Sequence, residues 1–312
     1  MSTRWPSANA HAAAPAVEVL RFAAFASRPG GGNPAGVVLD ASTLTDAAMQ
    51  QIAADVGYAE TAFVVGSDSE TDDRTLRVRY FSPGAEVPFC GHATVATAVA
   101  LAERQGVGPF AFETPVGRII VDTARADADV PTAQDADVSV TASFTSVEPK
   151  VREIDPEVAE RLLTLLGLHR SDLDDSWPLQ EVYVGNWHPI VAIRTQETFD
   201  AFHFDPASIR ALMDERNWAG TVTVVWRQGF DGASVMHVEA RNLFPVGDIT
   251  EDPATGSAAA ALGAHLRGLG AITPPAQVKV HQGRHIGRPS LLIVDVPRTG
   301  GVTVTGTAIP ID

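Results

Sequence analysis

The sequence predicts an α+β protein made of two similar halves, each a sheet rolled around a central helix. One segment repeats another at a constant offset of 162 residues. The matching positions are Arg79 and Arg241, Pro83 and Pro245, and Glu86 and Asp248. A constant offset over several positions indicates that the chain contains two copies of one structural unit.

Each copy ends in a helical segment that is nearly apolar on every side. The segments cover residues 93–104, followed by Gly106, and 258–267, followed by Gly268. Both consist mostly of Ala, Val, Thr and Leu, so neither offers a face suited to water. A slender helix of this kind fits the interior of a rolled sheet, and we expect both helices to be central and buried.

The other elements of the first half follow from local patterns. Residues 17–25 are rich in Val, Leu and Phe and predict a strand, which leads into the glycine-rich turn 28–36. No helix and no Gly-Lys-Ser/Thr ending follows these glycines, so the turn is a strand connection and not a nucleotide loop. Residues 45–56 predict a surface helix ended by Gly57, and residues 58–65 predict the next strand.

Composition and charge exclude several classes of protein. The chain has 312 residues, 45% hydrophobic and 20% charged, which favours a soluble globular protein of two domains. No apolar stretch reaches the roughly 18 residues that a membrane span needs. The 38 acidic and 23 basic residues give a net charge of -15, which disfavours nucleic acid and anionic membranes as partners.

The single cysteine, Cys90, excludes an intrachain disulfide and a multi-cysteine metal site. It fits a reducing cytoplasm, where we expect the protein.

Residues 1–16 lack the basic start and continuous apolar run of a signal peptide and predict a disordered tail. The acidic stretch 122–137 is poor in large apolar residues and indicates a surface linker. We therefore expect a first half at 17–125, a linker at 126–140 and a second half at 141–312.

Glu60 is a carboxylate inside an otherwise apolar strand. Strand periodicity places it on the same face as Tyr58, Ala62 and Val64. Burial on that face would raise its pKa toward neutrality, which is the property that a general acid/base requires. The alternative is an edge strand on which Glu60 faces water, and the pattern alone leaves both possibilities open.

Both apolar helices are preceded by turns that bring polar residues to the helix N-terminus. Free backbone N–H groups and the helix dipole favour an anion at such a position. Two of these N-termini facing each other would form an anion-binding cleft between the halves. For Thr255, Gly256 and Ser257, ordinary helix capping is the alternative explanation.

Five segments resemble, in chain order, the signature blocks of PhzF-like proteins of phenazine biosynthesis. They are Gly32–Val37, Glu60–Val64, Phe89–Thr94, Glu251–Ala258 and Gln282–Ser290. The resemblance covers nearly all of the chain after residue 16. It implies a diaminopimelate epimerase-like fold of two pseudo-symmetric domains, each a rolled, mostly antiparallel sheet around a central helix. This agrees with the internal repeat.

The resemblance also implies roles for individual residues. Glu60 occupies the place of the acid/base glutamate, and His92, Asp252 and Ser257 would join it as catalytic residues. Substrate-binding positions are Asn33, Gly91, Thr255 and Gly256. The implied enzyme is a cofactor-independent isomerase that moves a proton within a small anionic metabolite of the dihydro-hydroxyanthranilate type. The family further suggests a homodimer.

Two other activities remain as alternatives. Related racemases and epimerases use two cysteines, one at each central helix, on opposite faces of the substrate carbon. Here Cys90 stands at the first position, but Pro253 stands at the second and cannot transfer a proton. A two-cysteine racemase is therefore disfavoured, and Cys90 is interpreted as a packed side chain. The other alternative is a metabolite-binding protein without turnover, for which an acid/base group is unnecessary.

No metal or cofactor site is predicted. His281 and His285 lie four residues apart, but their neighbours indicate a strand and a turn, where this spacing does not converge on a metal ion.

Overall fold

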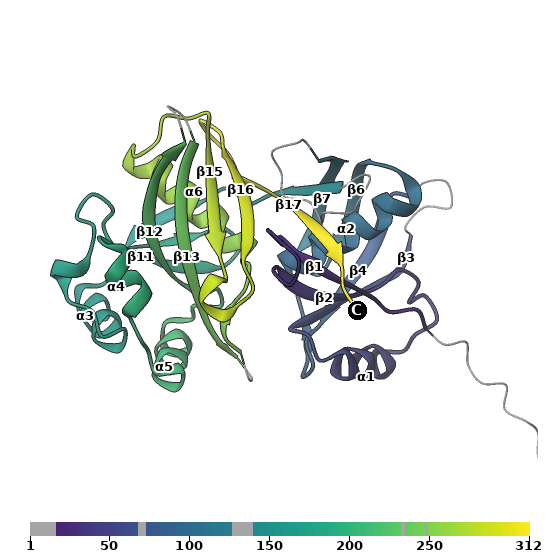
Figure 1. Ribbon diagram of the computed structural model, residues 1–312. Coiled ribbons are helices and arrows are strands. Elements are labelled where there is room, and N and C mark those ends of the chain that lie inside the picture. The colour runs from purple at the N-terminus through teal and green to yellow at the C-terminus, as the bar shows by residue number, and fades with distance from the viewer. Residues whose placement is uncertain (1–16, 68–72, 127–139, 232–234, 247–248) are drawn as a thin grey trace, which may run out of the picture.

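The computed structural model describes residues 17–67, 73–126, 140–231, 235–246 and 249–312. The expected tail at 1–16 lies outside these residues, as does nearly all of the expected linker at 126–140. Figure 1 shows two lobes side by side, with α2 inside one and α6 inside the other. All strands of the described residues join in one sheet that passes through both lobes.

The first half runs from β1 to β8. Its elements are β1 (Leu20–Ala24), β2 (Asn33–Val38), α1 (Asp46–Val56), β3 (Glu60–Ser67), β4 (Thr75–Phe81), β5 (Glu86–Val87), α2 (Gly91–Gln105), β6 (Gly108–Thr114), β7 (Gly117–Arg125) and β8 (Val140–Thr145).

The second half runs from β9 to β17. Its elements are β9 (Lys150–Glu153), α3 (Pro156–Leu165), β10 (Gln180–Tyr183), β11 (Trp187–Ile193), α4 (Gln196–Ala201), α5 (Pro206–Arg216), β12 (Val222–Asp231), β13 (Val235–Val246), β14 (Ile249–Asp252), α6 (Gly256–Leu269), β15 (Ala276–Gln282), β16 (Ser290–Val296) and β17 (Thr303–Pro310).

Strand pairing repeats in the two halves. In the first half β2 runs parallel to β3 and β4 runs parallel to β6, with a helix crossing over between each pair. In the second half β11 and β12, and then β13 and β15, repeat this arrangement. The other pairings between named strands are antiparallel. The expected mostly antiparallel α+β fold with two pseudo-symmetric halves is confirmed.

The two central helices are buried as predicted, but their ends differ from the prediction. Side chains 92–102 of α2 are all buried, as are 258–266 of α6. Both helices begin two residues earlier than expected, at Gly91 and Gly256. The second also continues through Gly268 and ends before Gly270, which has φ of 66°. This left-handed conformation is the usual helix stop, whereas glycine is merely tolerated inside a helix.

Helix α1 confirms the prediction for residues 45–56. The Thr45 side chain accepts a hydrogen bond from the Ala48 backbone, which caps the start, and Gly57 ends the helix with φ of 71°. Met49 and Ala53 pack against the sheet in a small cluster that includes Phe63. This helix therefore covers the outer face of β3, the strand that begins at Glu60.

The structure contains the internal repeat, but the turn before the central helix is longer in the second copy than in the first. Helices α2 and α6 begin 165 residues apart, and not the 162 of the sequence offset. In the first copy Arg79 pairs with Glu86. In the second copy Arg241 pairs with Glu251, three positions beyond the expected Asp248, which lies outside the described residues.

The second half carries an additional layer of helices. Along β11, Ile190 and Ala192 face the core around α6, whereas Val191 and Ile193 face a second core formed with α3 and α5. This alternation is the two-residue period of a strand buried on both faces. None of the helices in the described part of the chain combines the length and the hydropathy that a membrane span requires.

Strands β8 and β17 connect the halves. β8 pairs with β7, and β17 pairs with β16 and then with both β8 and β1. In Figure 1 the yellow strand β17 leaves the second half and ends in the first. Strand pairing between the halves is a long-range property that local composition cannot reveal, and the expected boundaries at 17–125 and 141–312 stay a prediction.

Candidate active site

Glu60 is the first residue of β3, an interior strand. β3 pairs with β2 on one side and β4 on the other, so the alternative of an edge strand is wrong. The Glu60 side chain is only 16% exposed. Its Oε2 lies 3.4 Å from His92 Nε2 and accepts a hydrogen bond of 3.4 Å from the Cys90 thiol.

These surroundings raise the pKa of Glu60 to about 7. Burial is the largest cause, and the negative charge of Asp252 adds to it, while the hydrogen bond from Cys90 opposes both. A carboxyl group with this pKa is present in both protonation states at neutral pH. It can therefore accept a proton and give one back without a large cost in either direction.

Asp252 reaches the same place from the second half. It ends β14, where Thr255 Oγ1 donates to its Oδ2 at 2.5 Å and Asn33 Nδ2 donates to its Oδ1 at 2.7 Å. Burial raises the pKa of Asp252 to about 6, although both hydrogen bonds favour the carboxylate. Two carboxyl groups with raised pKa, one from each half, thus lie near the junction, and the charge of Asp252 raises the pKa of Glu60.

His92 and Cys90 are neutral at physiological pH. Burial lowers the pKa of His92 to about 4, and a hydrogen bond with the backbone of Pro34 opposes this shift only in part. Burial, followed by the negative charge of Glu60, raises the pKa of the Cys90 thiol well above its ordinary value. A protonated thiol is a poor base and a poor nucleophile, which agrees with its interpretation as a packed side chain.

The N-termini of α2 and α6 lack side-chain caps, unlike those of the four other α-helices in the described residues. Helices α1, α3, α4 and α5 begin with a Thr or Asp whose side chain accepts from the backbone of the first turn. Cys90 and Thr255 do not cap α2 and α6. The Thr255 hydroxyl instead bonds Asp252, so ordinary capping does not explain this residue. Both first turns retain N–H donors for an anion.

These two N-termini, at Gly91 and Gly256, both lie close to the aromatic ring of Phe144. A Cβ atom at Gly91 would lie 3.3 Å from Phe144 Cζ, and one at Gly256 would lie 2.8 Å from the same atom. Phe144 belongs to β8, the strand that connects the halves. The two helix starts therefore approach each other as the sequence predicts, and only glycine avoids a close contact at Gly256.

Among the predicted site residues, Ser257 has the contacts that indicate least about its role. It lies half-buried in the first turn of α6, two residues beyond Thr255. Among the described residues, no hydrogen bond joins Ser257 to Glu60, His92 or Asp252. Its predicted role as a catalytic residue stays a prediction.

Sequence reasoning missed the role of Gln282. This buried side chain donates to the Asp252 carbonyl at 2.6 Å and to Thr255 Oγ1 at 3.0 Å, and it accepts from the Thr255 backbone at 3.2 Å. It therefore holds the turn that presents Asp252. The available signal was its position at the start of the block Gln282–Ser290, which was recognised only as a resemblance.

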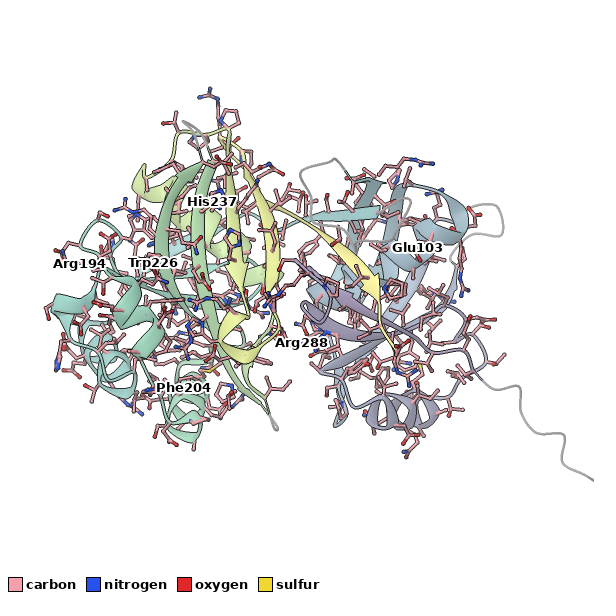
Figure 2. All side chains as sticks on the ribbon, viewed as in Figure 1. Glu103, Arg194, Phe204, Trp226, His237 and Arg288 are labelled. Carbon is pink, nitrogen blue, oxygen red and sulfur yellow. The ribbon has the colours of Figure 1, made fainter. Side chains whose placement is uncertain are left out.

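Arg288, at the other end of this block, was missed for the same reason. Its Nε donates to the Gly32 carbonyl at 2.7 Å, and the Gly32 N–H donates to the Pro289 carbonyl at 3.2 Å. In Figure 2 Arg288 lies between the two lobes. The block thus fastens the glycine-rich turn of the first half to the second half, next to Asn33.

One group of side chains has the composition of a metal site. Among the described residues, only Glu60, Cys90 and His92 bring three such ligand atoms within 4.8 Å of one another. A metal would have to displace the thiol proton, which the raised pKa of Cys90 opposes. One nitrogen of His92, Nδ1, already has Asn33 Nδ2 as a partner at 3.1 Å. These residues therefore fit a proton-transfer site better than a metal centre.

His281 and His285 point to different partners. His281 Nε2 lies 3.0 Å from His237 Nδ1, and His285 Nε2 lies 2.9 Å from Asp200 Oδ1. The expectation that their spacing does not bring them together on one metal ion agrees with this arrangement.

The family model described as "Phenazine biosynthesis-like protein" (PhzC-PhzF) matches residues 22–312, almost the full length of the described structure. The chain belongs to this family. Among PhzF-like relatives, the uncharacterized isomerase YddE of Escherichia coli (strain K12) is 31% identical over 303 residues, covering 94% of this chain and 95% of the relative. The trans-2,3-dihydro-3-hydroxyanthranilate isomerase of Pseudomonas chlororaphis is 31% identical over 270 residues, 86% of each chain. The prediction of a PhzF-like isomerase is confirmed.

Solved structures agree on the fold. The PhzF-family protein of Bacillus anthracis is 27% identical, has a TM-score of 0.78, and covers 95% of this chain and 97% of its own. A hydroxyproline epimerase of Agrobacterium vitis is only 13% identical but has a TM-score of 0.57, with coverage of 94% and 90%. The second likeness concerns the fold alone, and it connects PhzF-like proteins to the epimerase-like architecture that the sequence predicts.

Proposed function

We propose that the protein moves a proton within a small acidic metabolite of the dihydro-hydroxyanthranilate type, without a cofactor and with Glu60 as its acid/base. The observation that carries this proposal is the position of Glu60. Its carboxyl group is withdrawn from water, lies beside the uncapped start of α2 and is influenced by Asp252 of the other half. The name of the Pseudomonas chlororaphis relative supports the substrate class.

The substrate carboxylate would bind at the two helix starts. Backbone N–H groups in the first turns of α2 and α6, beginning at Gly91 and Gly256, supply the donors. Thr255 and Asn33 border this position from the second and the first half. Glu60 contacts Cys90 and His92 at the start of α2. A substrate whose carboxylate binds at the helix starts would therefore place its ring against Glu60.

The proton transfer needs one base and leaves the composition of the substrate unchanged. Glu60 as carboxylate takes a proton from one carbon of a conjugated system, whose electron pair moves into the adjacent double bond. The resulting carboxylic acid then returns a proton to another carbon, and the double bond has shifted. His92 and Asp252 would orient the substrate, with Ser257 assisting from the first turn of α6.

A racemase is supported less well than this isomerase. Two-base racemisation needs an ionisable group on each face of the substrate carbon, whereas Cys90 is held protonated and the buried Pro253 has no proton to transfer. A binding protein without turnover has no need for a carboxyl group with a pKa near neutrality, which costs stability.

Isotope transfer tests the proposal directly. Trans-2,3-dihydro-3-hydroxyanthranilate deuterated at the donor carbon is expected to give product in H₂O that carries part of the label at the receiving carbon. A sheltered carboxylic acid exchanges its single proton only as fast as water reaches it. Mass spectrometry and NMR of the product measure the label. Binding of this substrate without label movement, and without deuterium uptake in D₂O, would favour the binding protein.

The pH dependence is expected to report the pKa of Glu60. The first step uses the carboxylate, so kcat/KM should rise with pH through a midpoint near 7. Because the charge of Asp252 raises the pKa of Glu60, Asp252→Asn should move this midpoint to lower pH, whatever it does to the maximal rate. Rate profiles of both proteins between about pH 5 and 9 measure the midpoints. An unmoved midpoint would show that Glu60 is not the titrating base.

We also propose a homodimer located in the cytoplasm, on the family resemblance and the single cysteine. Sedimentation velocity is expected to give one species near twice the 32.9 kDa of the chain. A species at the mass of one chain over the whole working concentration range would contradict the dimer.

A further inference from the structure

The Asn33 amide joins the two halves at the site. Its Nδ2 lies 3.1 Å from His92 Nδ1, 2.7 Å from Asp252 Oδ1 and 3.0 Å from the carbonyl oxygen of Ala254. The carboxylate and the carbonyl can only accept hydrogen bonds, so the nitrogen of this amide and not its oxygen must face them. The side chain is 1% exposed, and water therefore cannot replace it easily.

The surrounding backbone holds Asn33 in place. Asn33 is the first residue of β2 and pairs with Ala24 of β1. The preceding residue, Gly32, is fixed by Arg288 and Pro289 of the second half. An amide anchored in this way from two sides keeps a constant direction and can impose an orientation on its partners.

The amide nitrogen determines which nitrogen of His92 carries the proton. The two hydrogens of this amide face three acceptors, so the hydrogen toward His92 Nδ1 is shared with a neighbouring oxygen. Because the amide nitrogen has no lone pair available to accept, the contact favours an unprotonated His92 Nδ1. A neutral imidazole carries one proton, which then resides on Nε2. Nε2 is the atom that lies 3.4 Å from Glu60 Oε2.

We infer that Asn33 is a positioning residue that holds His92 as the Nε2–H tautomer, so that His92 acts as a neutral hydrogen-bond donor beside Glu60 and not as a second base. The inference rests on the proposed function for its catalytic meaning. An Nε2–H group at this position can donate to negative charge that develops on the substrate while Glu60 holds the transferred proton. The same amide orients Asp252, so one side chain aligns the polar groups of both halves.

The tautomer can be measured without any substrate. Nitrogen NMR of protein labelled with ¹⁵N in histidine distinguishes protonated from unprotonated ring nitrogens, and the His92→Gln spectrum identifies the His92 signals among those of the nine histidines. In the native protein we expect a protonated Nε2 and an unprotonated Nδ1. A protonated Nδ1 would overturn the inference, whatever the outcome for catalysis by Glu60.

Asn33→Leu removes the amide donor and nearly keeps the size of the side chain. We expect the His92 signals to move toward a mixture of both tautomers and kcat to fall at least ~10-fold, the scale of about 1.4 kcal/mol in the barrier. Asn33→Ser provides a second variant if the first does not fold. Unchanged His92 signals in a folded variant would overturn the role of Asn33.

His188 provides an internal control in the same spectra. Its Nδ1 lies 3.1 Å from the Thr221 backbone nitrogen and 3.2 Å from the Thr221 carbonyl oxygen, and the residue is fully buried in the second half. Because the contacts of its Nδ1 are with Thr221 and not with Asn33, its signals should stay the same in both Asn33 variants. A general loosening of the fold would move the signals of His188 together with those of His92.

Discussion

Glu60→Gln is expected to lower kcat by at least ~10², the lower end of what a general acid/base contributes. The amide keeps the shape of the side chain but cannot accept and return a proton at neutral pH. Steady-state rates with the substrate that shows isotope transfer measure the loss. Turnover within a few fold of the native enzyme would contradict the one-base mechanism.

Two control variants separate this loss from general effects. Glu103→Gln changes an exposed glutamate on α2, the same helix that begins at the site, and should leave kcat unchanged. Its side chain is labelled in Figure 2, in the first half. Cys90→Ala removes the thiol beside Glu60 and should keep turnover within a few fold, because the thiol is held protonated. A large loss in a folded Cys90→Ala protein would restore thiol chemistry as a candidate.

The same Glu60→Gln protein should be more stable than the native one above about pH 7. The folded state raises the pKa of Glu60 from an ordinary 4.5 to about 7, so the folded protein binds this proton more tightly than the unfolded chain does. Native stability therefore falls as pH rises from about 4.5 to 7, and the amide avoids this loss. The gain is on the order of 1–3 kcal/mol. Thermal unfolding at pH 5 and pH 8 measures it, and a less stable variant at pH 8 would contradict the burial of a charged Glu60.

Glu251→Gln is expected to destabilise the protein by about 3 kcal/mol, because it leaves the charge of Arg241 buried without its counter-ion. In the native protein Arg241 Nη2 lies 2.5 Å from Glu251 Oε1, and the side chains are 9% and 8% exposed. The remaining partners of Arg241, the carbonyl groups of Phe199 and Phe202, do not carry a full negative charge. Urea unfolding measures the loss.

The internal repeat supplies a matched control for this variant. Glu86→Gln changes the corresponding ion pair of the first half, in which Arg79 is 26% and Glu86 is 36% exposed. Arg79 also keeps Asp46 as a second partner at 2.6 Å. Exposed ion pairs contribute less than about 1 kcal/mol, so this variant should be nearly as stable as the native protein. Equal losses in the two variants would contradict the dependence on burial.

The sequence predicted those features of the site that depend on the pattern of neighbouring residues. A carboxylate in an apolar strand pointed to Glu60, and two helices without a polar face predicted the central elements α2 and α6. Local patterns could not show that Asn33 and Asp252, 219 residues apart, form one hydrogen bond. Only the resemblance to the family placed these two residues in one site.

The features that were not predicted depend on tertiary contacts. The second helix passes Gly268 because the left-handed backbone of Gly270, and not the identity of the earlier glycine, ends it. The partner of Arg241 is Glu251 because the second turn is longer than the first, which a constant offset cannot represent. Gln282 acts through three hydrogen bonds to a distant turn. In the sequence it is a single polar residue at the end of a strand, and this pattern does not predict those hydrogen bonds.

The path of β17 has a consequence for the order in which the protein can fold. β1 and β8 belong to the first half, yet each uses β17 as one of its two neighbours. Ribosomes synthesise β17 after all the other strands of the second half. Until then the first half has two open strand edges, and open edges pair readily with other chains. The first half therefore cannot close its own sheet while the second half is still being made, although its sequence is already complete.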